Sequence, residues 1–299
     1  MPRSTSSLER FATTEIVMHE KYQNTLELNL KCDRTNKTIC AHQYTTYPLR
    51  LSTVFRLDGA NTNRAYLYTM NTSPGLLAKD ELKMSLQLED NTNLYLTDQA
   101  ATKVHPMPIE HSQATVDLQI ELRREASLEL VPEPVILYSD AALTQNISVK
   151  LHPTAKLFLS EIILPGRLAR GESYQFRYYF NRLKITDLTG KLLFTDAIHL
   201  QGKSNPFKDN KLFAPLPIMG NAIAVYPDLD LELLSKELEE IQVTNFPDLM
   251  VATSILPSDC GLLIRAFANK TIQLKQYFNL VLNCIRNLTE RVNLPYVPK

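Results

Sequence analysis

Glycine is scarce in this sequence, at 8 of 299 residues, well below the roughly 7% of an average protein. None of the patterns G-x-x-x-x-G-K-[ST], G-x-G-x-x-G or G-x-S-x-G occurs. Loops that cradle phosphates and turns that expose a nucleophilic serine need glycine, because their backbone must approach a ligand closely or adopt a positive φ. The sequence therefore disfavours nucleotide-dependent and serine-hydrolase chemistry.

Net charge is also absent, since 32 Lys and Arg residues balance 32 Asp and Glu residues. This balance leaves no basic surface for nucleic acid or for an anionic membrane, and near-zero net charge favours association with other proteins. No run of about 18 apolar residues occurs, and residues 1–20 lack the apolar stretch of a signal peptide. We expect a cytoplasmic protein that works in a complex, without membrane or nucleic acid.

Metal-binding patterns are missing as well. The four cysteines are too few and too scattered for a disulfide framework, and no H-x-x-x-H, C-x-x-C or Cys/His cluster is present. The sequence therefore predicts no tight metal site and no permanently bound cofactor, which argues against a metalloenzyme.

Alternating apolar and polar residues dominate the first 200 positions. Clear period-two runs occupy 26–30, 82–88, 116–122 and 174–180, and such runs place one strand face in a core. Shorter strand candidates lie at 49–57, 64–70, 94–97, 128–131, 135–138, 147–151, 157–164 and 192–200. Many short strands predict a mainly β fold of stacked sheets, either a sandwich or a β-helix-like coil. No repeat of fixed period is present, so a regular solenoid is not predicted.

The pattern changes after residue 200. Positions 201–221 contain three prolines and are typical of a connecting segment, whereas apolar residues at helical spacing follow Pro227 and predict a helix from about Leu231. A strand at 262–267 and a final helix at 271–290 complete the chain. We predict a single domain spanning 1–299, in which 1–200 form a β body and 201–299 contribute a linker, a strand and helices packed on it.

One unusual segment follows the strand candidate at 94–97. Gln99, Thr102 and Lys103 offer polar ends there, beside Ala100 and Ala101. Small residues let neighbouring backbones pack closely, so the segment is either a functional motif or a strand at a tight sheet contact.

Two carboxylates are the other candidates for chemistry. Prolines on both sides of Glu133 confine it to a bend or an edge strand, where it is either an acid, a base or a transient metal ligand, or simply solvated. Glu161 lies in an apolar run, where an ionised carboxylate is costly unless it is paired or wet. Arg167 and Arg170 are its candidate partners, so a structural ion pair and a functional site both remain open.

Five segments, in this order, resemble motifs of the UreD/UreH family of urease accessory proteins. They are 48–51 (PLRL), 73–80 (SPGLLAKD), 97–105 (TDQAATKVH), 128–137 (LELVPEPVIL) and 161–172 (EIILPGRLARGE). The resemblance is strong over about 45–200 and weaker elsewhere. It marks as motif residues Gln99, Thr102, Lys103, Gly166, Arg167, Gly171 and Glu172. This sequence departs from the family at Ala78, Lys79, Asp98, His105 and Glu133, among others.

The resemblance implies a β-helix-like body with about two C-terminal helices and a non-enzymatic, scaffolding role. It also implies a complex with the accessory protein UreF and, through it, the GTPase UreG, with a dimer conceivable inside that complex. The assembly would dock on apo-urease subunits, and nickel in transit would pass through an internal tunnel. Weak, replaceable ligands suit such a path, which agrees with the lack of a tight metal site.

Our hypothesis from the sequence is that Glu161, Glu133 and Asp80 lie along or near this passage. An alternative is a β-helix carbohydrate-active enzyme that uses Glu133 and Glu161 as a carboxylate pair, although the chain has no Trp for stacking on sugars. A further alternative is a β-rich scaffold for a different partner.

Overall fold

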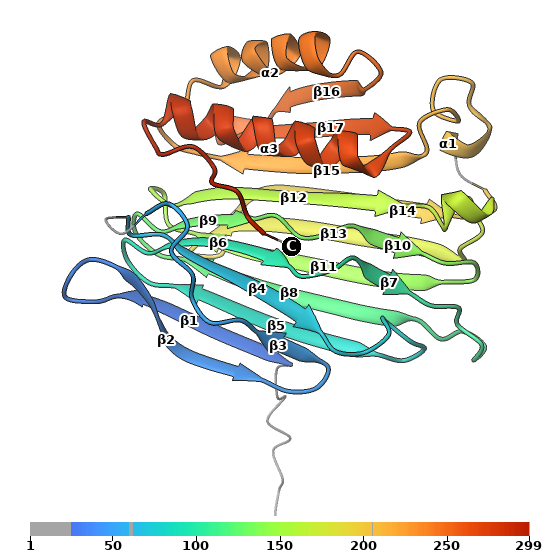
Figure 1. The fold of residues 1–299 in the computed structure, drawn as a ribbon, viewed down its shortest axis with the longest axis horizontal. Helices are drawn as coiled ribbons and strands as arrows, with labels where there is room; N and C mark the ends of the chain where they lie inside the picture. Colours follow the sequence, from blue (N-terminus) through green and yellow to red (C-terminus); the bar gives the residue numbers. More distant parts are fainter. Residues whose placement is uncertain (1–24, 60–61, 205, 299) are drawn as a thin grey trace, which may run out of the picture.

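The computed structural model describes residues 25–59, 62–204 and 206–298. The first twenty residues, from which we inferred that no signal peptide is present, lie outside this range. Within it the chain forms two stacked sheets with helices at one end (Figure 1). No described helix is both long and apolar enough to cross a membrane.

The first sheet has seven strands. In spatial order they are β14 (Leu192–Gln201), β13 (Tyr178–Asp187), β11 (Ala142–Leu151), β8 (Ala114–Leu122), β5 (Glu81–Leu88), β1 (Leu26–Cys32) and β2 (Thr38–Thr45). The five strands from β13 to β1 are mutually parallel, and the two edge strands are antiparallel to their neighbours.

The second sheet has ten strands. Its main order is β16 (Met250–Ile255), β17 (Leu262–Ala268), β15 (Ile218–Val225), β12 (Lys156–Leu164), β9 (Ser127–Leu130), β6 (Asn93–Asp98), β4 (Ala65–Asn71) and β3 (Leu49–Leu51). The short strand β10 (Val135–Leu137) joins β12 to β7 (Thr102–Val104). Strands β4, β6, β9 and β12 are parallel.

Apart from the short strands β7 and β10, which stay in the second sheet, successive strands alternate between the two sheets from β4 to β13. The chain therefore winds as a flattened coil, and its colours climb in order from β1 to β17 (Figure 1). The prediction of a mainly β, β-helix-like body with two C-terminal helices is confirmed. The turns of the coil are unequal in length, since Leu94 pairs with Leu128 and Leu128 with Leu157, which is why the sequence shows no fixed repeat.

Helices cover the outer face of the second sheet at its C-terminal end. They are α2 (Leu231–Asn245) and α3 (Thr271–Leu288). The short helix α1 (Pro206–Asp209) lies elsewhere, with Phe207 packed against the core between the sheets. Two 3₁₀ turns lie at Leu168–Arg170 and Pro257–Asp259. The Asp230 side chain accepts a hydrogen bond from the Leu233 N–H and caps α2. One apolar core lies between the sheets, and a second lies between α2, α3 and the strands beneath them.

The sequence predictions differ from the structure in several places. The run at 174–180 is not one strand: β13 begins at Tyr178, while Tyr174 and Phe176 are buried side chains of a bent segment that imitates the alternation. The segment 201–221 is not only a connection, because β15 begins at Ile218. All eight β15 residues are buried, so the strand shows no alternation that would reveal it. Strands β2 and β16 were also missed.

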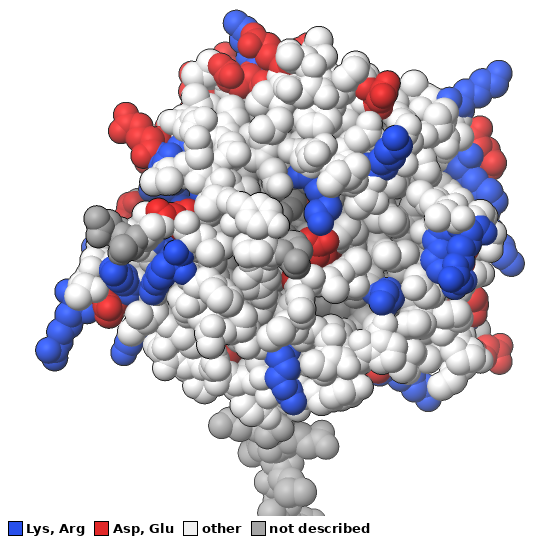
Figure 2. All heavy atoms as spheres, viewed as in Figure 1, with Lys and Arg blue, Asp and Glu red and all other residues white. Residues whose placement is uncertain are grey.

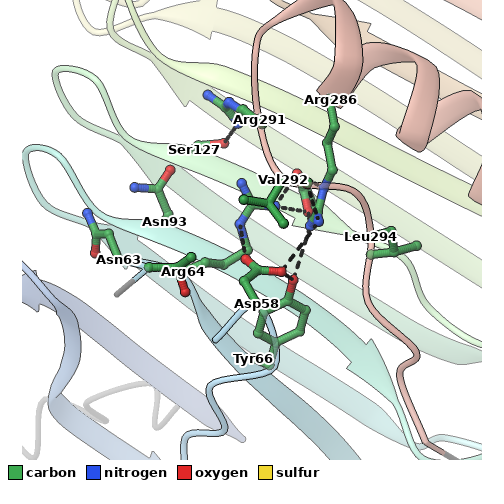
Figure 3. Close-up of polar contacts among 12 residues, drawn as sticks. Asp58, Asn63, Arg64, Tyr66, Asn93, Ser127, Arg286, Arg291, Val292 and Leu294 are labelled. Atoms are coloured by element: carbon green, nitrogen blue, oxygen red, sulfur yellow. Dashed lines mark hydrogen bonds and ion pairs between the residues drawn. The ribbon is translucent and has the colours of Figure 1, made fainter. Parts of the chain in front are cut away.

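A buried ion cluster ties α3 to the sheet. Glu129 on β9 is fully buried and receives Arg64 Nη1 at 2.6 Å and Arg286 Nε at 3.1 Å. Asp58 lies 3.6 Å from Arg286 and accepts a hydrogen bond from Tyr66. Figure 3 shows Asp58, Arg64, Tyr66 and Arg286 converging on one point from separate parts of the chain. Burial alone would lower the pKa of Arg286, but hydrogen bonding to Glu129 and the charge of Glu129 raise it.

We predict that Glu129→Gln lowers the free energy of unfolding by about 3–5 kcal/mol, because it leaves two buried guanidinium groups without their shared carboxylate. Urea unfolding followed by circular dichroism measures this loss. The matched control is Glu125→Gln, at the turn before β9, where the exposed pair with Lys156 is worth at most about 1 kcal/mol. Equal losses in the two variants would contradict the role of the cluster.

Candidate functional site

The two sheets enclose a cavity of about 160 Å³. Most of its lining is apolar and comes from the inward faces of the strands. Its charged lining residues are the carboxylates Asp98, Glu133 and Glu161. A small, mostly apolar hollow with a few acidic groups is an unusual interior, because ionised carboxylates are costly to bury.

Glu161 lies in the interior because of strand periodicity. On β12, Leu157, Leu159 and Ile163 belong to the core between the sheets, whereas Phe158 and Ile162 belong to the core under the helices. Glu161 has the same parity as the first set. It is 5% exposed, so the apolar run identified in the sequence is a strand buried on both faces.

The hydrogen-bond partners of the Glu161 carboxylate are neutral. Oε1 accepts from the Tyr179 hydroxyl at 2.6 Å and from Gln145 Nε2 at 2.8 Å, and Oε2 accepts from Asn181 Nδ2 at 2.8 Å. Neither candidate ion pair is formed among the described residues, since Arg167 pairs with Glu172 and Arg170 is exposed at the surface. Among the described ion pairs none involves Glu161, so its negative charge is held by dipoles only.

Burial therefore controls the protonation of this group. Desolvation raises the pKa of Glu161, and the hydrogen bonds from Tyr179, Asn181 and Gln145 offset only part of the rise. Burial and the neighbouring Glu161 charge also raise the pKa of Tyr179 well above its ordinary value. The site favours a neutral carboxyl group, or a carboxylate accompanied by a cation.

Further polar groups continue from Glu161 toward the edge of the sheets. Asn221 on β15 is in register with Glu161 and also lowers its pKa, although its amide does not meet hydrogen-bond geometry. The Asn181 Oδ1 atom and both Asn221 amide atoms are buried without a hydrogen-bond partner in the described part of the chain. Arg265, in register with Asn221, binds Asp196 at 2.7 Å.

These residues define a polar row of Gln145, Glu161, Asn181, Asn221, Arg265 and Asp196. A second hollow of about 30 Å³ lies along it, and Glu161, Asn181, Asn221 and Asp196 are among its lining residues. Because Glu161 lines both hollows, it lies between them. The smaller hollow has room for about one water molecule, so this is the narrow point of the interior.

Glu133 lies between β9 and β10, strands of the same sheet as Glu161, and it lines the larger cavity. It also lines an outer hollow of about 350 Å³ beside α3 and the C-terminal segment. Its carboxylate binds Lys275 Nζ at 2.9 Å through both oxygens, and its backbone N–H donates to Asp98 at 3.2 Å. Glu133 and Glu161 thus line one common cavity.

Asp80 is placed differently. Its carboxylate accepts the Leu77 N–H at 2.8 Å and closes the turn before β5, and it is not among the described residues that line the cavity. Thr102 does line the cavity, whereas Gln99 and Lys103 are exposed at the surface. The second of the five motifs thus forms a turn, and the third contributes three wall residues, Asp98, Ala100 and Thr102.

The last motif builds a corner after β12. Arg167 donates to Glu172 at 2.6 Å and lies over the Tyr138 ring at 4.5 Å. A side chain at Gly166 would come within 2.3 Å of the Glu172 carbonyl oxygen, and Gly171 has φ of 72°. Glycine is required at both positions. This corner is a structural element and does not line the cavity.

The sequence analysis missed most partners of the carboxylates. The burial of Asn181 could have been predicted, because it lies on the same strand face as the buried residues Tyr179, Leu183 and Ile185 of β13. Asn221 lies in a strand that was not predicted. No group of three or more His, Cys, Asp or Glu residues arranged to hold a metal ion occurs in the part of the chain that the structure describes. The interior instead offers single carboxylates and amide oxygens.

We predict that Glu161→Gln changes how stability depends on pH. The raised pKa means that the folded chain keeps a proton on Glu161 that the unfolded chain loses above about pH 4.3. The wild type therefore loses stability as pH rises through this window, by at most about 1.4 kcal/mol per pH unit. The Glu161→Gln variant carries no titrating group at this position and lacks this loss. Its free energy of unfolding, relative to that of the wild type, therefore increases as pH rises. Urea unfolding between pH 4 and pH 8 measures it, and a pH-independent difference would contradict the assignment.

Comparisons with known proteins point to one family. The family model described as UreD urease accessory protein matches residues 23–298. A urease accessory protein UreD of Trichodesmium erythraeum is 55% identical over 92% of this chain and 99% of that protein.

More distant relatives carry the same description. Identity is 28% to the protein of Photorhabdus laumondii, over 88% of this chain and 81% of that protein. It is 30% to the protein of Haloarcula marismortui, over 81% of this chain and 80% of that protein. The family model covers nearly the whole described chain, and the chain belongs to the UreD family of urease accessory proteins.

Proposed function

We propose that this protein assists nickel insertion into apo-urease by guiding the ion through its interior, and that it catalyses no reaction of its own. The observation that supports this most is Glu161, a buried carboxylate without a cationic partner among the described ion pairs, between two hollows. A passing divalent cation would supply the missing positive charge. Nickel is the cargo in this proposal and not a resident cofactor.

The chemistry of the interior suits transient binding. Nickel is held tightly by imidazole and thiolate groups and weakly by carboxylates and amides. The Glu133 and Glu161 carboxylates and the unpartnered Asn181 and Asn221 oxygens are all of the weak kind. An ion that meets one such ligand at a time can move on, whereas a closed site of three or four strong ligands would retain it.

Partners and location follow from the family as part of the same proposal. We infer that the chain works in the cytoplasm as a scaffold, bound to UreF and through UreF to UreG, and that this complex docks on urease subunits. We further infer that residues 1–299 act as one unit. The helices that share a core with the second sheet support this, since they extend the β body and do not form a separate core.

The carbohydrate-enzyme alternative gains little from the geometry. Glu133 and Glu161 do face a common cavity, but its volume of about 160 Å³ is below the roughly 300–1,000 Å³ of ordinary ligand sites. Glu133 is also neutralised by Lys275. A glycosidase needs two carboxyl groups with a sugar between them, and this interior has no room for one.

The test is urease activation in cells that produce Glu161→Ala or Glu133→Ala in place of the wild-type chain. We expect each variant to lower activation by about tenfold, the factor that corresponds to the loss of one charged ligand. Urease activity and the nickel content of purified urease are the two readouts. Co-purification of UreF and urease subunits reports whether the variant still folds and assembles.

The matched control is Glu89→Ala, which removes an exposed carboxylate from the turn after β5. It should leave activation unchanged. Full activation by both interior variants, with partner binding intact, would make Glu161 and Glu133 structural residues only and would refute the proposed passage.

A further inference from the structure

Glu133 separates two hollows of the molecule. The interior cavity and the outer hollow beside α3 share three lining residues, Pro132, Glu133 and Ser160. The inner side of this boundary is the core between the sheets, and the outer side is the surface under the C-terminal segment. The wall between the cavity and the exterior is therefore only one layer of side chains thick here.

Lys275 closes this wall from outside. It belongs to the second turn of α3, and its ammonium group lies 2.9 Å from both carboxylate oxygens of Glu133. The Lys275 side chain is 35% exposed and the Glu133 side chain 11%. The lysine thus reaches in from solvent and the glutamate faces the interior. Figure 2 shows acidic atoms recessed near the middle of this face, next to basic atoms.

The C-terminal segment completes the outer rim. Leu294, Pro295, Tyr296 and Val297 line the outer hollow together with α3. This segment crosses the outer face of the second sheet after α3 ends (Figure 1). The buried cluster of Arg286 and Glu129 holds the far end of α3 against the sheet, and near its start the ammonium of Lys275 contacts Glu133.

We propose that the Lys275–Glu133 ion pair is a gate at the outer mouth of the interior cavity, which a divalent cation opens by displacing the Lys275 ammonium from the carboxylate. The inference rests on the proposed passage of nickel and adds the way its entry is controlled. Lysine suits this role because its charge sits on a flexible four-carbon chain and makes no fixed bidentate fork. A dication attracts the same carboxylate with twice the charge.

This gate also explains why an empty interior stays closed. Without a cation, the lysine neutralises Glu133 and covers the boundary to the cavity. With a cation at Glu133, the lysine is repelled and the boundary opens inward, toward Glu161. The gate therefore favours entry of divalent over monovalent ions. A monovalent ion carries the same charge as the Lys275 ammonium, so Glu133 attracts it no more strongly.

The experiment measures access to the cavity without using urease. A Ser160→Cys variant places a thiol on the shared wall, where the native side chain is 3% exposed. Its reaction with a small methanethiosulfonate reagent is followed in the full-length chain by peptide-resolved mass spectrometry. The partly buried native Cys40 serves as an internal reference.

We expect Lys275→Ala to raise the labelling rate at position 160 by about tenfold, because one charged hydrogen bond no longer holds the wall closed. Lys275→Arg, which can keep the pair, and Lys236→Ala, which removes an exposed lysine of α2, should leave the rate within about twofold. Melting temperatures of all variants are measured alongside. An unchanged rate in Lys275→Ala at an unchanged melting temperature would overturn the gate.

Equilibrium dialysis against nickel chloride tests the displacement step. Removing the competing ammonium in Lys275→Ala should tighten nickel binding by about tenfold, and adding Glu133→Gln should abolish the gain. Equal nickel binding by wild type and Lys275→Ala would contradict displacement. Because neither assay involves urease, a failed gate is distinguishable from a failed passage, which is judged by the Glu161→Ala activation result.

Discussion

The alternation of the chain between two stacked sheets is the constraint on which the rest of this structure depends. Every strand of the coil turns one face to a shared interior and the other face outward. The environment of a charged residue is therefore decided by its parity along the strand. Neighbouring strands β9 and β12 carry one buried glutamate each, and the two have opposite parity.

The two glutamates show what each face provides. Glu129 points outward beneath α3, where Arg64 and Arg286 neutralise it and turn it into an anchor for the C-terminal helix. Glu161 points inward, where Tyr179 and Asn181 offer only dipoles. A buried carboxylate that lacks a cation is costly, so Glu161 does not contribute to stability as Glu129 does. The same fold thus separates an anchoring carboxylate from the carboxylate that we propose as a transient ligand by one strand face.

Much of the β body was predictable from sequence because its signal is local. The alternation at 82–88 and 116–122 marked β5 and β8, and the apolar run around Glu161 marked β12. Strand β15 escaped prediction because Gly220 and Asn221, residue types typical of turns, interrupt its apolar run, and because its burial on both faces leaves no alternation. The bend at Tyr174 was mistaken for strand because buried rings imitate the alternation of a strand.

The candidate site was predictable only in part, for a related reason. Burial of Glu161 followed from its apolar neighbours, but the identity of its partners did not, since Gln145 and Asn181 arrive from the facing sheet. The Lys275–Glu133 pair joins residues 142 positions apart. Such pairings depend on the register of the coil and on the docking of α3, and neither is encoded by spacing along the chain. Local composition indicates which carboxylates are unusual, while the fold decides what faces them.

The central claim is that the interior carries nickel past Glu161. Diffraction at the nickel absorption edge, from crystals of the full chain soaked in a nickel salt, tests it most directly. The account predicts partially occupied anomalous density beside Glu161, close to the oxygens of Asn181 and Asn221, and its loss from crystals of Glu161→Gln. Nickel bound only at outer-surface histidines, with none between the sheets, would contradict it.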